Sequence, residues 1–210
     1  MTSFARAERA ALADVLLAAG PDAPTLCEGW ATRDLAAHLV LRERRPDAAA
    51  GIMIKPVAGH TRKVQDRLAA GDYAALVGKV RTPPPHLRPG FAEEAMNLIE
   101  FFIHLEDVRR AAPGWTPREI SGSYAQALAG RVKTSARLSA RRFPARIEVG
   151  GPGVAPFTAG RGDDSAPRVS VQGAPGELLL FFTGRQSVAG VSIAGPEDLA
   201  ENLRGARLGI

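Results

Sequence analysis

Cysteine and aromatic residues are scarce in this sequence. Among 210 residues there is one cysteine, Cys27, and Phe, Trp and Tyr together make up 6%. A single cysteine excludes a disulfide within the chain, so nothing in the composition argues for secretion. The sequence also lacks an apolar run long enough to span a membrane, and its charged N-terminus does not resemble a signal peptide. We therefore expect a cytoplasmic protein that has no membrane partner.

A nucleic-acid-binding motif is also missing. The formal net charge is +5, and basic residues cluster around residues 42–45 and 131–142. Proteins that bind nucleic acids usually combine a basic stripe with interleaved aromatic residues or a recognisable motif. The scarcity of aromatic residues therefore predicts solvated helix faces and no nucleic-acid partner, although the positive charge would favour anionic small molecules.

The hydrophobic periodicity divides the chain into two parts. Helical patterns fill the first two-thirds, and alternating patterns typical of strands begin after Pro144. We expect a domain of helices over residues 1–143 and a small α+β domain over residues 144–210. The predicted helices cover residues 4–19, 32–45 (with Thr32 as its N-cap), 61–70, 73–80, 90–111, 122–142, 176–182 and 196–203. The predicted strands cover residues 146–149, 157–159, 168–171 and 188–193.

The most informative pattern is the pair Glu100 and His104 on a predicted helix. Side chains four residues apart lie one turn apart on the same face, where a carboxylate and an imidazole can both reach one divalent metal. The helix is apolar nearly all round, which is typical of a buried helix, so its polar stripe would face an internal site. The alternative is a solvent-facing pair on a helix that packs on two sides. The stripe consists of Glu93, Asn97, Glu100, His104 and Asp107.

His38 is the best candidate for a third metal ligand. It lies among apolar residues of another predicted helix, whereas His60 lies at a predicted helix start and His86 in a predicted loop. A second buried helix with one imidazole would complete a His/Glu/His site. A lone histidine on an apolar face is, however, more often a hydrogen-bonded core residue.

The segment around His38 resembles a known family. The pattern Trp-x-x-x-Asp-Leu-x-x-His, followed later by Glu-x-x-x-His, is similar to the signature of the mycothiol-dependent maleylpyruvate isomerase family of actinobacteria. Its members belong to the DinB-like metal-binding four-helix bundles. The resemblance covers residues 4–142, and residues 176–185 resemble the second domain of the family less specifically. The matching positions are Trp30, Asp34, Leu35, His38, Glu100 and His104.

The resemblance implies a metal-dependent enzyme. It implies Zn²⁺, or another divalent ion such as Ni²⁺ or Fe²⁺, bound by His38, Glu100 and His104. Three protein ligands leave a coordination position open, which is the catalytic pattern for zinc. In the family this position is thought to take the thiol of mycothiol, which the metal activates. The expected activity is that of a mycothiol S-transferase or isomerase, a monomer or homodimer whose partners are a small-molecule thiol and an electrophile.

Four residues near His38 have weaker assignments. Asp34, one turn before His38, could accept a hydrogen bond from an imidazole, although a carboxylate there also suits the start of a helix. Arg42, one turn after His38, could bind an anionic substrate or be solvated. Trp30 could line the pocket or pack its own loop. Cys27 has no cysteine or histidine at ligand spacing, so we expect a packing role for it.

Two other functions are compatible with the same residues. A metal-dependent hydrolase would use metal-bound water at the open position, and its turnover would need no thiol. A non-catalytic metal-binding or ligand-sensing protein would need neither metal-bound water nor a thiol.

Overall fold

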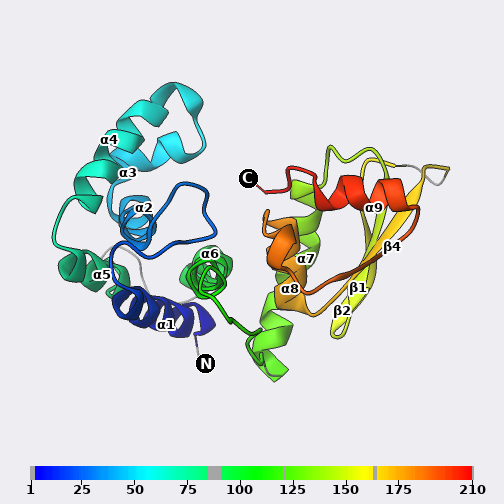
Figure 1. Cartoon of the computed structure of the whole chain (residues 1–210), viewed down its shortest axis with the longest axis horizontal. Coiled ribbons are helices and arrows are strands. Elements are labelled where there is room, and N and C mark those ends of the chain that lie inside the picture. The colour runs from blue at the N-terminus through cyan, green and yellow to red at the C-terminus, as the bar shows by residue number, and fades with distance from the viewer. Residues whose placement is uncertain (1–2, 85–90, 121, 163–164, 210) are drawn as a thin grey trace. The chain divides into compact units, whose positions relative to one another are not determined.

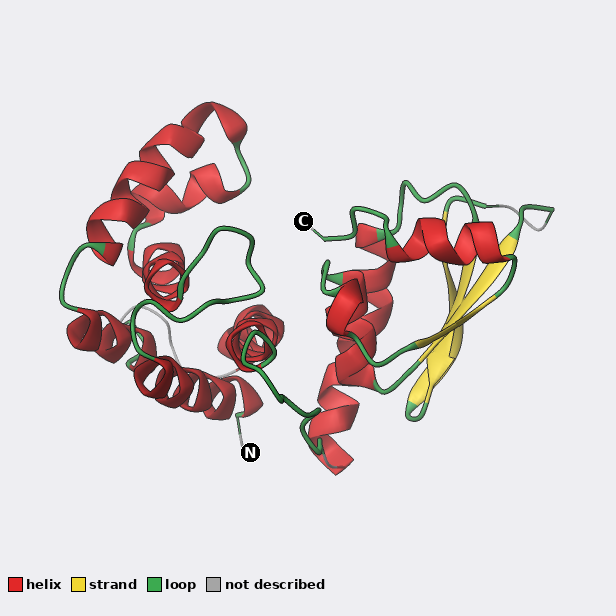
Figure 2. Ribbon diagram, viewed as in Figure 1, coloured by secondary structure: helices red, strands yellow, loops and turns green. Residues whose placement is uncertain are grey.

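The computed structural model describes residues 3–84, 91–120, 122–162 and 165–209, and the side chains of residues 91–96 fall outside this description (Figures 1 and 2). His86 and the side chain of Glu93 therefore lie outside the described part. The chain forms two compact units, Met1–Thr116 and Pro117–Ile210.

The first unit is helical. Helix α1 packs along α6 and α5, and α2 packs against α4 and α5. The predicted helices are found close to their expected limits, except that α4 begins three residues before the expected Thr61. The helices are α1 (Phe4–Ala19), α2 (Thr32–Arg44), α3 (Pro46–Ala49), α4 (Ala58–Ala69), α5 (Tyr73–Arg81) and α6 (Phe91–Arg109).

The first turn of α2 differs from the prediction. Ala31, and not Thr32, is the N-cap residue, and its N–H donates a hydrogen bond to the Asp34 carboxylate at 3.0 Å. The Thr32 hydroxyl instead donates to the carbonyl of Gly20. The prediction of Thr32 as the cap is therefore wrong by one residue, because Asp34, the third residue of the helix, accepts the N–H of Ala31 as the third helical residue does in a capping box.

The hydrophobic core of this unit lies between α1, α2, α5 and α6. The pattern of α6 explains its central place, because its apolar side chains lie on both flanks of the polar stripe and are almost fully buried. Each such side chain contributes about 1.5–3 kcal/mol on burial. The largest members of the core are Leu12, Leu16, Leu35, Leu39, Phe101 and Leu105.

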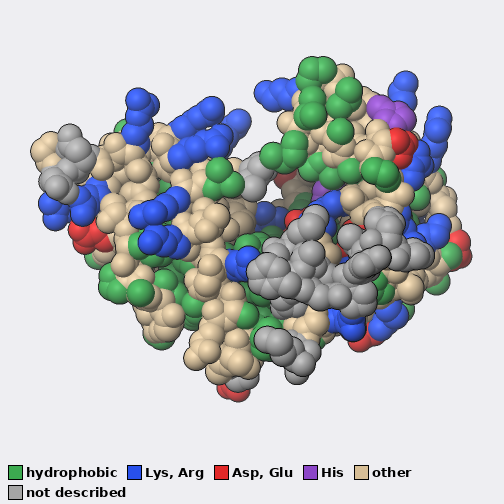
Figure 3. Space-filling view, turned by 180° about the vertical axis from the view of Figure 1, so that it is seen from behind, with side chains coloured by type: hydrophobic (Ala, Val, Ile, Leu, Met, Phe, Trp, Pro, Cys, Tyr) green, Lys and Arg blue, Asp and Glu red, His purple; other side chains and the backbone are tan. Residues whose placement is uncertain are grey.

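The connection between α3 and α4 carries exposed apolar side chains. They form the green group at the upper right of Figure 3. The group consists of Ile52, Met53, Ile54 and Val57. Among the described residues, none of the helices has both the length and the hydrophobicity needed to cross a membrane. The cytoplasmic location stays a prediction.

The second unit is a small α+β structure. Its sheet has the order β2-β1-β3-β4, in which β1 pairs with β2 as an antiparallel hairpin and with β3 in parallel. Helix α7 packs against α8 and β2. The elements are α7 (Gly122–Ser139), β1 (Arg146–Gly151), β2 (Val154–Gly160), β3 (Arg168–Gln172), α8 (Pro175–Phe182), β4 (Ser192–Ala194) and α9 (Glu197–Arg204).

Two sequence predictions differ from this unit. The strand expected over residues 188–193 is shorter, because the Gly190 N–H donates to the Glu177 carboxylate at 2.7 Å and the chain turns there before β4. The expected division between residues 143 and 144 placed residues 122–142 in the bundle, whereas α7 lies in the second unit. The buried stripe of α7 predicts a packed helix but not its partner. The fold class, a helical bundle followed by an α+β module, is confirmed, and the limits of separately folding domains stay a prediction.

Candidate metal centre

The structure brings His38, Glu100 and His104 together from two helices. Glu100 Oε1 lies 3.5 Å from His38 Nε2 and 3.3 Å from His104 Nε2. One donor atom of each residue lies within 4.8 Å of the others. Helix α2 supplies His38, and one turn of α6 supplies the other two residues. The three predicted ligands are thus neighbours in space although the sequence separates them widely.

The donor set fits a divalent cation. Ligands about 2.0–2.2 Å from a tetrahedral zinc ion lie about 3.4 Å from one another. The two measured separations from Glu100 Oε1 are close to this value. Two imidazoles and one carboxylate suit zinc and similar ions, and three ligands are the number that catalytic sites use. Both histidines are only 9% exposed, whereas the Glu100 side chain is 26% exposed. The site is therefore buried on the histidine side and accessible at the carboxylate.

The second nitrogen of His104 is held by a carboxylate. Its Nδ1 lies 2.9 Å from Oδ2 of Asp107, whose side chain is fully buried. Such a contact orients a histidine ligand and leaves Nε2 for the metal. Asp107 belongs to the polar stripe of α6, whereas the supporting role was expected for Asp34, whose carboxylate instead accepts the Ala31 N–H at the start of α2. The spacing of three residues between His104 and Asp107 was the signal that could have identified this pair.

Arg42 and Trp30 both contact the predicted ligands. Arg42 Nε lies 3.4 Å from Glu100 Oε1, and its Nη1 donates to Asn97 Oδ1 at 2.9 Å. The Trp30 ring lies against the His38 ring, with centroids 5.1 Å apart. The positive guanidinium of Arg42 therefore lies beside the Glu100 carboxylate, and the aromatic ring of Trp30 lies beside the His38 imidazole. His60 lies elsewhere, where an exposed Asp47 approaches it at 3.5 Å.

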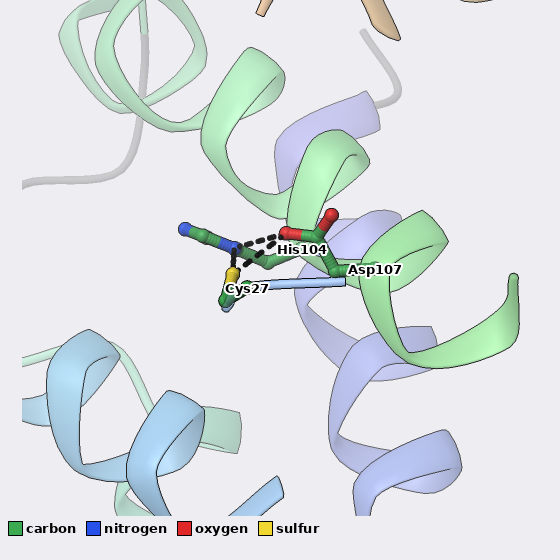
Figure 4. A group of neighbouring side chains, drawn as sticks. All are labelled: Cys27, His104 and Asp107. Atoms are coloured by element: carbon green, nitrogen blue, oxygen red, sulfur yellow. Dashed lines mark hydrogen bonds and ion pairs between the residues drawn. The ribbon is translucent and has the colours of Figure 1, made fainter. Parts of the chain in front are cut away.

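Cys27 was not expected at the site. Its Sγ lies 3.2 Å from Oδ2 of Asp107 and 4.0 Å from Nδ1 of His104 (Figure 4). The loop that carries Cys27 joins α1 to α2, and it also donates the Leu26 N–H to the carbonyl of Asp107 at 3.1 Å. Local spacing could not have shown these contacts, because the partners are 77 and 80 positions away in the chain.

Contacts within the site shift the pKa values of Glu100 and His104. Burial raises the pKa of Glu100, but hydrogen bonds from His104 and His38, and the positive charges of His104 and Arg42, outweigh burial and hold it well below 4.5. Burial lowers the pKa of His104, but hydrogen bonds with Asp107, Cys27 and Glu100 outweigh burial and hold it well above 6.5. The metal-free site therefore favours a carboxylate beside a protonated imidazole. A cation would replace the proton between Glu100 and His104.

Comparisons with known proteins agree on one family. The family model for the mycothiol maleylpyruvate isomerase N-terminal domain matches residues 4–185. A crystal structure of a histidine-to-alanine mutant of the mycothiol-dependent maleylpyruvate isomerase is similar, with 16% identity, a TM-score of 0.58, and coverage of 92% of this chain and 96% of that chain. The crystal structure described without a mutation has 17% identity, the same coverage and a TM-score of 0.54. At these identities the likeness shows the fold. No curated protein matches.

Proposed function

The chain belongs to the mycothiol maleylpyruvate isomerase family, and from this premise we propose that it is a metal-dependent enzyme that activates the thiol of mycothiol for attack on a small electrophile. The observation that carries the proposal is the three-donor group of His38, Glu100 and His104. The separations within this group suit one cation, and the group is accessible beside Glu100.

Each of the three residues would offer the cation one atom. His38 and His104 would bind through Nε2, and Glu100 would bind through its carboxylate. A divalent cation held there supplies a position at which a thiol loses its proton at neutral pH. Asp107 accepts a hydrogen bond from the Nδ1–H group of His104, and this bond favours the tautomer that presents Nε2 to the site.

Arg42 and Trp30 would complete the reaction environment. The Arg42 guanidinium is permanently charged and lies beside Glu100, so it can attract an anionic electrophile to the accessible side of the site. The Trp30 ring packs against the His38 ring and would line that side of the pocket. These positions support the roles that the sequence suggested for the two residues.

Isomerisation and transfer share their first step. The thiol sulfur forms a bond to one carbon of an activated double bond, and the electron pair of that double bond moves onto the electrophile. An isomerase then breaks the same C–S bond after rotation and returns the thiol unchanged. In a transferase the C–S bond is kept, and the added electron pair either takes a proton from water or departs with a leaving group of the electrophile. The electrophile, and not the metal ligands, decides between these outcomes.

The test combines metal content with thiol-dependent turnover. Elemental analysis of the purified protein should find about one divalent ion per chain, and His38→Ala should lose both the ion and the turnover of mycothiol with a panel of electrophiles. His60→Ala is the matched control, because this exposed histidine contacts Asp47 instead of the site. Wild-type protein without bound metal would contradict the proposal. Metal-dependent turnover without a thiol would identify a hydrolase, and metal binding without any turnover would identify a binding protein.

A further inference from the structure

The buried carboxylate of Asp107 has a second donor that the proposed chemistry does not use. We propose that Cys27 is a positioning residue, whose thiol holds Asp107 and thereby fixes the His104 imidazole and the loop beside the metal centre. The consequence for metal binding rests on the proposed function. The orientation of His104 can be measured without a metal.

One carboxylate oxygen of Asp107 accepts two hydrogen bonds. Oδ2 of Asp107 lies 2.9 Å from Nδ1 of His104 and 3.2 Å from Sγ of Cys27. Asp107 is fully buried, so solvent does not reach its carboxylate in the folded protein. Figure 4 shows the three side chains pointing toward one another. Two donors at one oxygen limit the rotation of the carboxylate, and this carboxylate orients the imidazole.

Several hydrogen bonds hold the loop that carries Cys27. The Cys27 N–H donates to Oγ1 of Thr25 at 3.1 Å, and the Thr25 hydroxyl donates to the carbonyl of Trp30 at 2.8 Å. The Leu26 N–H donates to the carbonyl of Asp107. The loop is therefore fixed to α6 near Cys27, and its other end places Trp30 against His38 on α2. One loop thus touches both helices that supply the proposed ligands.

Cys27 and Glu100 lie near different nitrogens of the His104 ring. Cys27 lies near Nδ1 of His104, whereas Glu100 lies near Nε2, the nitrogen on the other side of the ring. Cys27, His104 and Asp107 also form a group of possible donors. Their Nδ1–Oδ2 separation of 2.9 Å is a hydrogen-bond distance and is shorter than the separation of about 3.4 Å between two zinc ligands. A shared proton fits this gap better than a cation.

The experiment uses the full chain with Cys27→Ala, Cys27→Ser and Val15→Ala. Val15 is a matched control, because it is a partly buried residue that packs against the same core. Zinc affinity is measured by competition with a chelator. Cys27→Ala should weaken it about threefold to tenfold, at or below the range known for groups that support metal ligands. Cys27→Ser keeps a donor and should restore most of the affinity, and Val15→Ala should leave it unchanged.

A double-mutant cycle shows whether Cys27 acts through Asp107. In the Asp107→Ala background, Cys27→Ala should have no further effect on zinc affinity, because the group on which the thiol acts is gone. Additive effects, or an unchanged affinity in Cys27→Ala, would overturn the inference. A thiolate-to-metal charge-transfer band in the wild-type protein with one equivalent of Co²⁺ would also overturn it, because Cys27 would then be a ligand.

Nitrogen NMR of metal-free protein labelled in its histidines separates this inference from the proposed function. Cys27→Ala should shift the Nδ1 signal of His104, and Cys27→Ser should shift it less. If the wild-type protein binds no zinc, the proposed function fails, and this spectrum still decides whether Cys27 orients His104. An unchanged spectrum in Cys27→Ala would refute the positioning role.

Discussion

His104 uses both edges of its ring. Nε2 faces Glu100 at 3.3 Å, and Nδ1 faces Asp107 at 2.9 Å. In the metal-free protein this arrangement favours the imidazolium, and metal binding needs the neutral ring. Protons and the cation therefore compete for one nitrogen. The contact with Asp107 thus has two effects: it favours the protonated ring in the metal-free protein, and it holds Nε2 in the orientation that a cation would need.

The stability of the metal-free protein should depend on pH through this pair. The folded-state pKa of His104 is raised above 6.5, so its contribution is fully present below pH 6.5 and is lost as the pH rises through the raised value. The folded-state pKa of Glu100 is lowered below 4.5, so its contribution is fully present above pH 4.5 and is lost as the pH falls through the lowered value. Both contributions to stability are fully present between pH 4.5 and pH 6.5.

Urea unfolding of the chelator-treated protein over a pH series would measure this effect. We expect the free energy of unfolding of the wild-type protein to exceed that of Glu100→Gln most clearly between pH 4.5 and 6.5. The difference should shrink on both sides of this window. A difference that is constant across the series would show that the two groups are not coupled in the folded protein.

At the scale of elements, a buried ion pair joins α1 to α2. Arg9 donates to both carboxylate oxygens of Glu43, at 2.7 and 2.6 Å, and also to the carbonyl of Val80 at the end of α5. Its guanidinium lies 4.4 Å from the centre of the Phe101 ring on α6. One arginine of α1 that is 1% exposed therefore contacts three other helices of the unit, α2, α5 and α6. The position of α2, and hence of His38, depends partly on this contact.

Removal of the carboxylate of this pair should destabilise the protein. Glu43→Gln removes the charge of the carboxylate that Arg9 binds through two hydrogen bonds, and loss of one partner of a buried ion pair typically costs about 3–5 kcal/mol. Chemical denaturation measures the loss. Asp14→Asn is the control, because it removes the exposed pair of Asp14 with Arg81, and such pairs contribute about 0–1 kcal/mol. Equal losses in the two variants would contradict the special role of the buried pair.

The sequence predicts the helices, and the residues of the group formed by His38, Glu100 and His104, better than it predicts the long-range partners of other residues. Helical periodicity locates the helices, and the polar stripe on an apolar helix identifies Glu100 and His104. Cys27 is missed because its contacts are 77 and 80 positions distant. An apolar stripe shows that one face of α7 is buried but not what covers it, so the predicted domain limit at residue 143, which places this helix in the first domain, stays a prediction. Information about pairing over long distances is weak in one sequence.

At the scale of the whole molecule, the proposed metal site belongs to one of the two compact units. His38, Glu100 and His104 all lie within Met1–Thr116. A ligand that binds only the folded state stabilises it by about 2.7 kcal/mol when its free concentration is 100 times its Kd. The residues that would hold the cation lie on α2 and α6, so a bound cation would stabilise these two helices most directly.

Removal of metal should therefore have a local signature. We expect hydrogen exchange after treatment with a chelator to increase most at the amides of α2 and α6, and zinc to reverse the increase. Mass spectrometry of peptides resolves these helices from the rest of the chain. The His38→Ala variant is the control, and its exchange should not respond to zinc. An equal change in every helix, or a change confined to other elements, would contradict the proposed site.

The two ends of the proposed site are distant along the chain, with roughly 60 residues between His38 and Glu100. A cation that joined them would close a loop of this length, so α2 and α6 could not separate while it stayed bound. Closing a loop of many residues costs more chain entropy than closing a short one. Glu100 and His104 are one turn apart and close almost no loop. His38 would therefore contribute most of the topological constraint, and metal release would first free α2 to move away from α6.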